Sequence, residues 1–360
     1  MLYELLYSLR NSFSPFNVFR YITFRTTLAV FTALIITFII APAVIRWLKK
    51  ISMTQQIRDE GPKSHYAKAG TPTMGGIIIL SAITISMLMW GNFRNIYISV
   101  AMFSLLGFGA IGFLDDYLKA VKKNPKGLRG IYKFGAQMVV ALAIGIFMYK
   151  NPHDPYSTVL SIPFFKKWLF DFGVFYIPFS VFVVVGSSNA VNLTDGIDGL
   201  AIGLVAIATI ANVALVYVSG HAQFAKYLQV LYLPGIGELT VFCGAMLGAA
   251  LGFLWYNTHP AEVFMGDLGS LGLGGALGTI AVLSKHEIVL AVVGGIFVIE
   301  TISVVMQVTS FKLTGKRIFR MAPIHHHFEL KGWPEQKVIV RFWIVGIILA
   351  LFSLATLKLR

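Results

Sequence analysis

Residues 95–117 read NIYISVAMFSLLGFGAIGFLDDY, an apolar run that ends in two carboxylates, Asp115 and Asp116. About 20 residues of helix are enough to cross the hydrocarbon of a bilayer, so this run predicts a membrane-spanning helix. Adjacent carboxylates where such a helix leaves the lipid are costly unless something cationic compensates them. The stretch therefore predicts a membrane fold together with a charged site at the membrane boundary.

Other apolar runs of similar length occur along the whole chain. The composition agrees with them, because 56% hydrophobic residues, 13% charged residues and a mean hydropathy of +0.74 lie far from the values of a soluble domain. The runs are continuous rather than alternating, which favours helices over a transmembrane barrel. They cover residues 23–48, 72–90, 95–114, 132–149, 172–187, 199–218, 238–256, 263–283, 288–310 and 338–357. We predict an all-α polytopic membrane protein with ten transmembrane helices in one domain, residues 1–360.

The remaining features of the chain suggest no second domain. The first apolar run is too long for a signal peptide and is followed by Arg46, Lys49 and Lys50, so we expect it to be retained. Cys243 is the only cysteine and lies inside an apolar run, which excludes a disulfide framework. The gap 150–171 contains prolines and is expected to hold a short hairpin or an interfacial helix.

The basic residues are unevenly distributed between the gaps. The gaps that follow the odd-numbered runs, with their flanks, hold 19 of the 30 lysines and arginines. By the positive-inside rule these gaps are cytoplasmic and both termini are periplasmic. Lys123 and Lys316 are therefore expected in the cytoplasm, and Lys166 outside.

The net charge of +14 has more than one reading. It signals topology and attracts anionic lipid, and the dense group of Lys119, Lys122, Lys123, Lys126 and Lys133 beside an acidic motif also suits phosphate binding. Nucleic acid is a poor partner because no basic soluble domain exists to carry it.

The polar motifs all follow odd-numbered runs. A chain that crosses a bilayer repeatedly returns to the same side after every second crossing, so these motifs can converge. They comprise residues 112–117, 189–199, 256–260, 265–270 and 322–329. We predict one active site formed by the cytoplasmic loops after helices 1, 3, 5, 7 and 9.

Each acidic motif also has a purely structural alternative. Asp115 and Asp116 could be solvated interface charges, although a helix C-terminus is electrostatically the wrong end for carboxylates. Asp195 and Asp198 could cap the next helix, but capping needs only one side chain, and Asn192 adds another polar group. The crowding of these groups favours a site.

Two further carboxylates are open to the same question. Asp267 could be a first-turn carboxylate of its helix, but Gly266 and Gly269 would let a ligand approach the backbone. Glu300, halfway along an apolar run, is expected to pair inside the bundle, for instance with Ser303 or Thr301.

Three successive histidines, His325, His326 and His327, cannot all face one point on a helix, although a loop could present two of them. The absence of cysteines and of a His-x-x-x-His spacing disfavours zinc here, and contact with phosphate or substrate is preferred.

Asp-rich ligands without cysteine favour a hard cation, and Mg²⁺ typically uses one or two carboxylates together with substrate phosphates. The acidic clusters and nearby lysines thus predict phosphoryl chemistry on a Mg²⁺-bound polyanion. Neither a P-loop nor a kinase glycine-rich pattern is present.

The chain resembles the polyprenyl-phosphate N-acetylhexosamine-1-phosphate transferases over essentially all of its 360 residues. The matching motifs are residues 112–116, 189–200, 265–267 and 320–330. The last of these, with residues 71–76 and 333–335, is similar to the branch that handles N-acetylmuramoyl-pentapeptide. No acidic motif position departs from the pattern.

The resemblance implies a reaction and its partners. Phospho-N-acetylmuramoyl-pentapeptide passes from UDP-N-acetylmuramoyl-pentapeptide to undecaprenyl phosphate, which gives lipid I and UMP with Mg²⁺ as the cofactor. It also implies ten helices in the bacterial inner membrane and a homodimer.

Residue roles are carried over from the resemblance position by position. Asp267 is expected to bind Mg²⁺, and Asp115 and Asp116 to face the lipid phosphate. One of these carboxylates would take a proton before direct attack on the β-phosphate, while a covalent aspartyl route stays open. The remaining residues are expected to bind substrate: the nucleotide-site residues Lys68, Thr73, Asn192, Asp195, Asp198, Asn257, Phe264, Gly266, Ser270 and Gln307, the sugar or phosphate contacts His325, His326 and His327, and the lipid-phosphate candidates Lys119, Lys122 and Lys133.

Two other functions are compatible with parts of the pattern. A sibling transferase that uses N-acetylglucosamine-1-phosphate shares the aspartate motifs, but the histidine loop argues against it. A secondary transporter could use Glu300 as a proton site, yet it would concentrate its charges near the membrane midplane.

Overall fold

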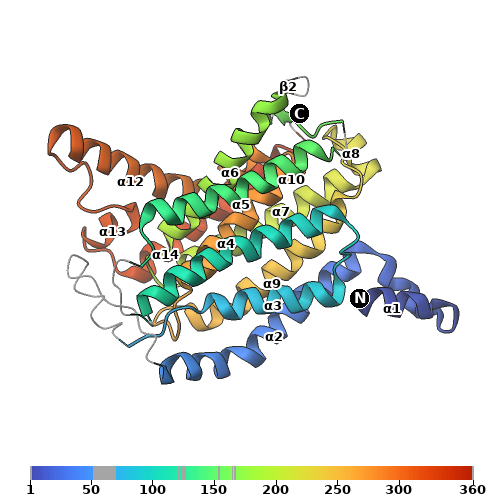
Figure 1. Ribbon diagram of the computed structural model, residues 1–360, viewed down its shortest axis with the longest axis horizontal. Coiled ribbons are helices and arrows are strands. Elements are labelled where there is room, and N and C mark those ends of the chain that lie inside the picture. Colours follow the sequence, from blue (N-terminus) through green and yellow to red (C-terminus); the bar gives the residue numbers. More distant parts are fainter. Residues whose placement is uncertain are drawn as a thin grey trace.

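The computed structural model describes residues 2–51, 70–120, 122, 127–152, 155–163, 165 and 168–358. Over these residues the protein is a bundle of long helices with one small pair of strands (Figure 1), as expected for an all-α polytopic membrane protein. The helices are α1 Leu2–Ser8, α2 Ile22–Lys50, α3 Gly76–Trp90, α4 Ile96–Ala120, α5 Gly130–Lys150, α6 Tyr176–Thr194, α7 Leu200–Gly220, α8 Ala222–Leu228, α9 Leu239–Asn257, α10 Gly266–Ser284, α11 Glu287–Val293, α12 Gly295–Thr314, α13 Ile324–Glu329 and α14 Glu335–Ala355.

Nine helices in the described part of the chain are long and apolar enough to cross a bilayer: α2, α4, α5, α6, α7, α9, α10, α12 and α14. The predicted run 72–90 corresponds to α3, which has only 15 residues. The chain before α3 is extended instead, because Phe264 donates its backbone N–H to Pro72 and accepts one from Gly75, both at 2.8 Å. Ten crossings therefore stay a prediction.

The predicted run 288–310 is divided in the structure, so its boundaries were wrong. α11 ends at Val293 and α12 begins at Gly295. Gly294 separates them, in keeping with the low helix propensity of glycine. After this break α12 leans away from the other helices (Figure 1), and apolar side chains such as Ile302 and Phe311 are exposed along it. Exposed apolar side chains on a spanning helix suit contact with lipid.

The gap between α5 and α6 holds a hairpin. β1 (Val159–Ser161) pairs antiparallel with β2 (Leu169–Asp171), with Val159 opposite Asp171. The structure thus decides between the hairpin and the interfacial helix that the sequence left open.

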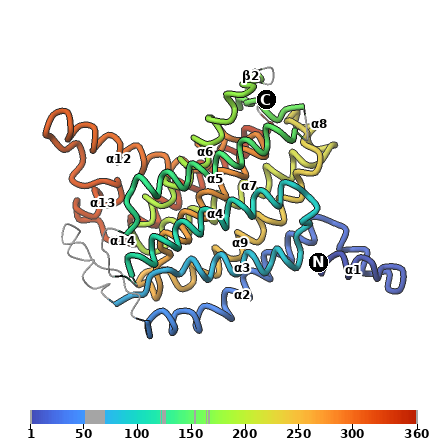
Figure 2. The backbone as a smooth tube through the Cα atoms, viewed as in Figure 1, coloured from blue at the N-terminus to red at the C-terminus, as the bar shows by residue number. Residues whose placement is uncertain are grey.

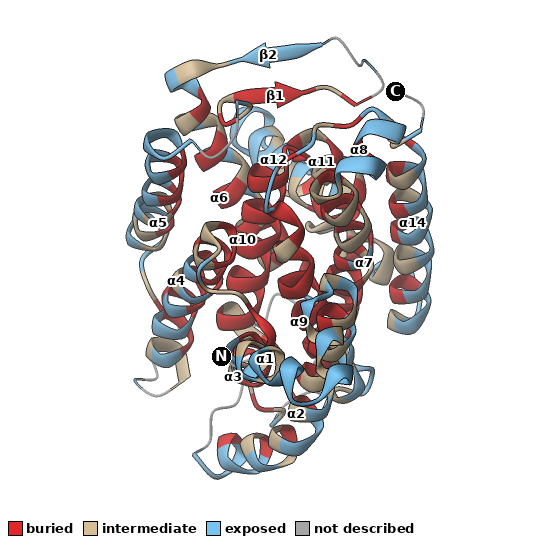
Figure 3. Cartoon of the chain, turned by 90° about the vertical axis from the view of Figure 1, so that its right-hand side faces the viewer, coloured by how far each residue is buried: buried red, intermediate tan, exposed pale blue. Residues whose placement is uncertain are grey.

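The core of the bundle is α10, in which every residue from Leu268 to Ser284 is buried. Figure 3 shows it surrounded by the other helices, and its glycines allow this close packing. A Cβ on Gly274 would lie 2.7 Å from Ser188 Cα of α6, and one on Gly278 would lie 2.8 Å from Val184 Cα. Small residues at the contacts of membrane helices let backbones approach in this way. α10 is therefore a rigid support for the residues at its first turn.

The ends of the bundle differ in character. Along the trace in Figure 2, both termini, α8 and the hairpin lie away from the end where α4, α12 and α13 meet the loops of the polar motifs. The motifs that follow the odd-numbered apolar runs are thus gathered at one end of the molecule.

Candidate active site

The centre of the site joins the end of α4 to the first turn of α10 through two lysines. Lys119 Nζ lies 2.7 Å from Asp115 Oδ2 and 2.8 Å from Asp267 Oδ2. Lys133 Nζ, from the first turn of α5, lies 3.1 Å from Asp115 and 2.8 Å from Asp267. Asp115 is buried, and its other oxygen accepts the N–H of Leu128 at 2.6 Å. Two ammonium groups thus compensate two carboxylates at the place where the sequence required a cation.

Asp116 is held against the same turn of α10. Its Oδ2 accepts the N–H of Leu268 at 3.0 Å, which ties the end of α4 to the first turn of α10. Glycines make this approach possible: a Cβ on Gly112 would lie 2.1 Å from the backbone oxygen of Asp267, and one on Gly266 would lie 2.6 Å from Asp116 Oδ2. Gly266 also has a φ of +74°, a backbone conformation that favours glycine.

α6 supplies the amide that orients Asp267. Asn192 Nδ2 donates to Asp267 Oδ1 at 2.7 Å and lies 2.8 Å from Ser270 Oγ. Ser270 is buried and donates its hydroxyl to the backbone oxygen of Gly266. Asp267 is therefore fixed on one side by an amide and on the other by the two lysines.

Asp195 follows directly after α6, and its carboxyl faces other negative groups. Surrounding protein, followed by the charges of Asp267, Asp116 and Asp198, raises the pKa of Asp195 to about 8. The group is therefore mostly protonated at neutral pH in this state of the protein. A cation bound nearby would favour its ionised form.

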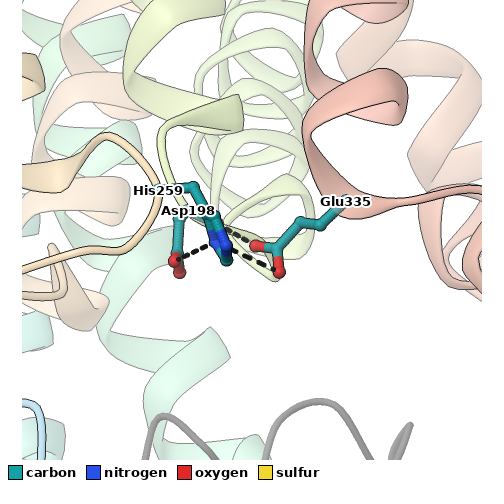
Figure 4. A group of neighbouring side chains, drawn as sticks. All are labelled: Asp198, His259 and Glu335. Atoms are coloured by element: carbon teal, nitrogen blue, oxygen red, sulfur yellow. Dashed lines mark hydrogen bonds and ion pairs between the residues drawn. The ribbon is translucent and has the colours of Figure 1, made fainter.

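Asp198 belongs to a separate cluster with His259 and Glu335 (Figure 4). Its Oδ2 lies 3.0 Å from His259 Nδ1, and the same nitrogen lies 3.6 Å from Glu335 Oε2. All three positions lie in motifs of the sequence, but only Asp198 was expected in the site. No spacing could have revealed the group, because its members come from the α6–α7 loop, the end of α9 and the start of α14.

Three of the expected substrate residues shape the loops of the site. Asn257 is buried, accepts the N–H of Gly199 at 3.0 Å and donates to the backbone oxygen of Val263 at 2.9 Å. Phe264 holds the extended chain before α3 through its backbone. Thr73 Oγ1 would lie 3.1 Å from a Cβ on Gly266, which brings this threonine close to the first turn of α10.

The histidines of α13 point in different directions, as expected for successive residues of a helix. His325 is fully buried with its Nδ1 3.1 Å from Glu300 Oε1 of α12, so Glu300 pairs with this histidine rather than with Ser303 or Thr301. The other ring nitrogen of His325 would be only 2.3 Å from a Cβ on Gly196, next to Asp195.

The other two rings of the triplet have their own partners. His326 Nδ1 lies 2.7 Å from Glu329 Oε2, and its ring centroid is 4.1 Å from that of His325. His327 turns away and accepts the N–H of Arg320 at 3.1 Å. Partial burial and the charges of Lys331 and Arg320 lower the pKa of His327, which suits this role as a neutral acceptor.

Some expected site residues are not brought to the centre. The amide of Gln307 binds the loop after α12. Its Oε1 accepts the N–H groups of Ile318 and Phe319 at 3.0 and 2.9 Å, and its Nε2 donates to the backbone oxygen of Phe319 at 3.1 Å. Lys122 is exposed, and no contact to the carboxylates is recorded for it among the described residues. Lys68 lies outside the described residues.

The centre is chemically suited to a cation and a phosphate together. Both ammonium groups bridge Asp115 Oδ2 and Asp267 Oδ2, so these oxygens already converge on positive charge. Hard oxygen donors of this kind match Mg²⁺, and the lysines can turn to phosphate oxygens when a metal neutralises the carboxylates.

Comparison with known proteins agrees with this arrangement. Residues 96–285 match glycosyl transferase family 4, and residues 68–80 match signature 1 of phospho-N-acetylmuramoyl-pentapeptide-transferase.

Curated proteins with that transferase name align over all of this chain and all of their own length. They include those of Thermodesulfovibrio yellowstonii (69% identical), Pelobacter propionicus (57%) and Citrifermentans bemidjiense (56%). The family match covers α4 to α10, the helices that carry the carboxylate–lysine centre, and it leaves the transporter alternative without support. The chain therefore belongs to glycosyl transferase family 4, as a relative of the phospho-N-acetylmuramoyl-pentapeptide-transferases.

Proposed function

We propose that this protein transfers phospho-N-acetylmuramoyl-pentapeptide from its uridine diphosphate carrier to undecaprenyl phosphate, which yields lipid I and UMP. The carboxylate–lysine centre of Asp115, Asp267, Lys119 and Lys133 carries the proposal, because it combines metal-type and phosphate-type groups where a membrane helix ends. One substrate is a soluble polyanion and the other a phosphate at the bilayer surface. The reaction therefore needs a site at the membrane boundary, where both substrates can reach it.

Mg²⁺ is the proposed cofactor, with Asp267 as its main ligand. Asn192 keeps one oxygen of this carboxylate oriented, and such support fixes the geometry of a ligand. The ion would neutralise charge that develops on the diphosphate as UMP leaves.

Asp115 and Asp116 are proposed to face the lipid phosphate. In direct attack, one of them accepts the phosphate proton and the freed oxygen forms a bond to the β-phosphorus of the sugar nucleotide, while the bond to UMP breaks. Lys119 and Lys133 are proposed to hold the lipid phosphate, and the contact of both ammonium groups with Asp115 Oδ2 supports this role. Asp195, which feels the charges of Asp267 and Asp116, and His325, which lies beside Gly196, are proposed to bind the nucleotide and the sugar phosphate.

The proposed sugar substrate is favoured over N-acetylglucosamine-1-phosphate by the names of the full-length relatives and by the signature at residues 68–80. We further propose an inner-membrane location, a site that opens to the cytoplasm and a homodimeric assembly. Positive-inside counting supports this orientation.

A reconstituted assay tests the proposal. Purified protein with Mg²⁺ and undecaprenyl phosphate should release UMP from UDP-N-acetylmuramoyl-pentapeptide and not from UDP-N-acetylglucosamine. Product from the second nucleotide alone would support the sibling activity instead. Release of one UMP per enzyme before any lipid is added would contradict direct attack and support a covalent route.

Asp267→Asn should lose most of this turnover, because the amide keeps the shape of the side chain but removes the charge that Mg²⁺ requires. Excess Mg²⁺ should restore part of the rate. Unchanged turnover with an unchanged Mg²⁺ dependence would contradict the assignment of Asp267 as the metal ligand.

A further inference from the structure

The cluster of Asp198, His259 and Glu335 has the composition and spacing of a transition-metal site distinct from the carboxylate–lysine centre. One ligand atom from each residue lies within 4.8 Å of the other two. The carboxylates are almost completely buried, with side-chain exposures of 2% and 9%, while the imidazole of His259 is 32% exposed. Figure 4 shows both carboxylates directed at the same imidazole. The site therefore has fixed acidic donors and an open side from which an ion could enter.

The distances fit donors that share one ion. Ligands of a tetrahedral Zn²⁺ with bonds of about 2.1 Å lie about 3.4 Å apart. The separations of His259 Nδ1 from the two carboxylate oxygens are 3.0 and 3.6 Å and so bracket that value. Three protein ligands with a free fourth position are a common zinc arrangement.

Backbone groups already orient both carboxylates. Asp198 Oδ2 accepts the N–H of Ala261 at 3.2 Å. Glu335 Oε1 accepts the N–H of Asp198 at 2.9 Å, which leaves Oε2 directed at His259. Such supporting hydrogen bonds are typical of metal ligands because they set the direction of the donor oxygen.

We propose that Asp198, His259 and Glu335 bind a divalent transition-metal ion of the Zn²⁺ class. An imidazole nitrogen with two carboxylates suits Zn²⁺ better than Mg²⁺, which prefers oxygen and retains its water. The bound ion joins the α6–α7 loop, the end of α9 and the start of α14. This proposal does not depend on the transferase reaction.

The competing arrangement is a metal-free ion pair, in which a protonated His259 contacts both carboxylates. The two arrangements make opposite demands on His259 Nδ1, since a metal needs its lone pair and an ion pair needs its proton. A cysteine at this position separates them, because a thiolate binds Zn²⁺ strongly but cannot supply the positive charge.

The experiment uses the full-length protein, purified without a histidine tag and treated with a chelator. Zn²⁺ is titrated by calorimetry, and Co²⁺ is added as a spectroscopic probe of coordination. We expect one strong Zn²⁺ per chain, a rise in Tm on Zn²⁺ addition and a Co²⁺ absorption spectrum that includes nitrogen coordination. His259→Gln and Glu335→Gln should each weaken this binding by at least about 10-fold.

Matched variants separate this site from others. His221→Asn, at the start of α8, and Asp267→Asn, in the proposed Mg²⁺ site, should keep the strong Zn²⁺ binding. His259→Cys should keep it too and add a thiolate band to the Co²⁺ spectrum, which also shows that the variant has folded.

Equal Zn²⁺ affinity in wild type, His259→Gln and Glu335→Gln would overturn the proposal. So would failure of wild type to bind Zn²⁺ in preference to Mg²⁺. Loss of binding in His259→Cys, with the other properties of the folded protein retained, would favour the ion pair.

Discussion

The carboxyl groups of the site are held by different partners, and the carboxyl of Asp195 is expected to titrate near neutral pH. Asp115 and Asp267 face ammonium groups, and Asp116 faces a helix N-terminus. Asp195 faces other carboxylates, and its pKa is raised to about 8. A cation bound beside Asp195 would favour the ionised form of its carboxyl.

Asp195 should make the ligand-free protein less stable as the pH rises. Because its pKa in the folded state, about 8, is above the usual value of about 3.9, the stabilisation from its proton is full at low pH and is lost as the pH rises towards 8. Asp195→Asn cannot lose such a proton. The Tm of this variant minus that of wild type should therefore increase between pH 5 and pH 9 in thermal unfolding experiments.

Asp171 in β2 provides the control for this experiment. Hydrogen bonds from Thr158 and Gly173 lower its pKa, so the group stays ionised over the whole range. The Tm difference between Asp171→Asn and wild type should be constant between pH 5 and pH 9. A constant difference for Asp195→Asn as well would mean that its carboxyl is already ionised at pH 5.

The buried pair of Glu300 and His325 should show strong energetic coupling. Each side chain is fully buried and faces the other at 3.1 Å, so truncation of one leaves a buried polar partner, at a cost of about 1–3 kcal/mol. Glu300→Ala and His325→Ala should each lower Tm, and the double variant should lower it by less than the sum. Turnover should fall in both, because His325 lies against Gly196.

Glu287→Ala is the matched control for this cycle. Glu287 is also a buried acid, but it bonds Tyr176 rather than a histidine of α13. Its effect should add to that of His325→Ala. Simple additivity in the Glu300 cycle would show that the contact contributes nothing to stability.

The contact between α4 and α10 depends on the absence of a side chain at Gly112. A Cβ there would lie 2.1 Å from the backbone oxygen of Asp267, and a helix backbone cannot yield as a flexible side chain does. Gly112→Ala should therefore destabilise the protein by about 1–3 kcal/mol and reduce turnover, because it separates Asp116 from the first turn of α10.

Gly186→Ala in α6 tests whether this effect is local. A Cβ on Gly186 meets no atom within 4 Å, so this substitution should leave Tm and turnover unchanged or raise Tm slightly, given the helix propensity of alanine. Equal behaviour of the two variants in thermal unfolding and turnover would contradict the packing argument.

In the whole molecule, the polar motifs lie at one end of the bundle and the termini lie away from it. The charge distribution predicts which end is cytoplasmic. Single cysteines at positions 123, 166 and 316 can be labelled from outside intact cells after replacement of the buried Cys243. Only position 166 should react, because positive-inside counting puts the other two in the cytoplasm. Lys316 is exposed between α12 and α13, whereas Lys123 and Lys166 lie outside the described residues.

Reaction at position 316 but not at 166 would contradict the predicted orientation. The carboxylate–lysine centre would then face the outside of the cell. A detergent-permeabilised sample, in which all three positions should react, controls for access.

Much of the architecture follows from the sequence because it depends on local properties. Long apolar runs predict spanning helices whatever their neighbours. The parity of crossings predicts that the loops after the odd-numbered apolar runs meet. The acidic motifs stood out for the same reason: Asp115 and Asp267 lie at the ends of apolar runs and Asp195 lies in the short gap between two of them, where charge is costly. The break at Gly294 and the short α3 were missed, because glycine alone does not end a membrane helix and the pairing of Phe264 with Pro72 is not local.

Only the tertiary structure decided which groups pair. Lys119 and Lys133 reach the carboxylates, while Lys122 is exposed. α4 ends at Ala120, before Lys122, and the docking of α5 brings Lys133 to the centre. Glu300 meets His325 across two helices, and Asp198 meets Glu335 from 137 positions away in the chain. No periodicity records such contacts, since each joins residues of different elements that only the packing of the bundle brings together.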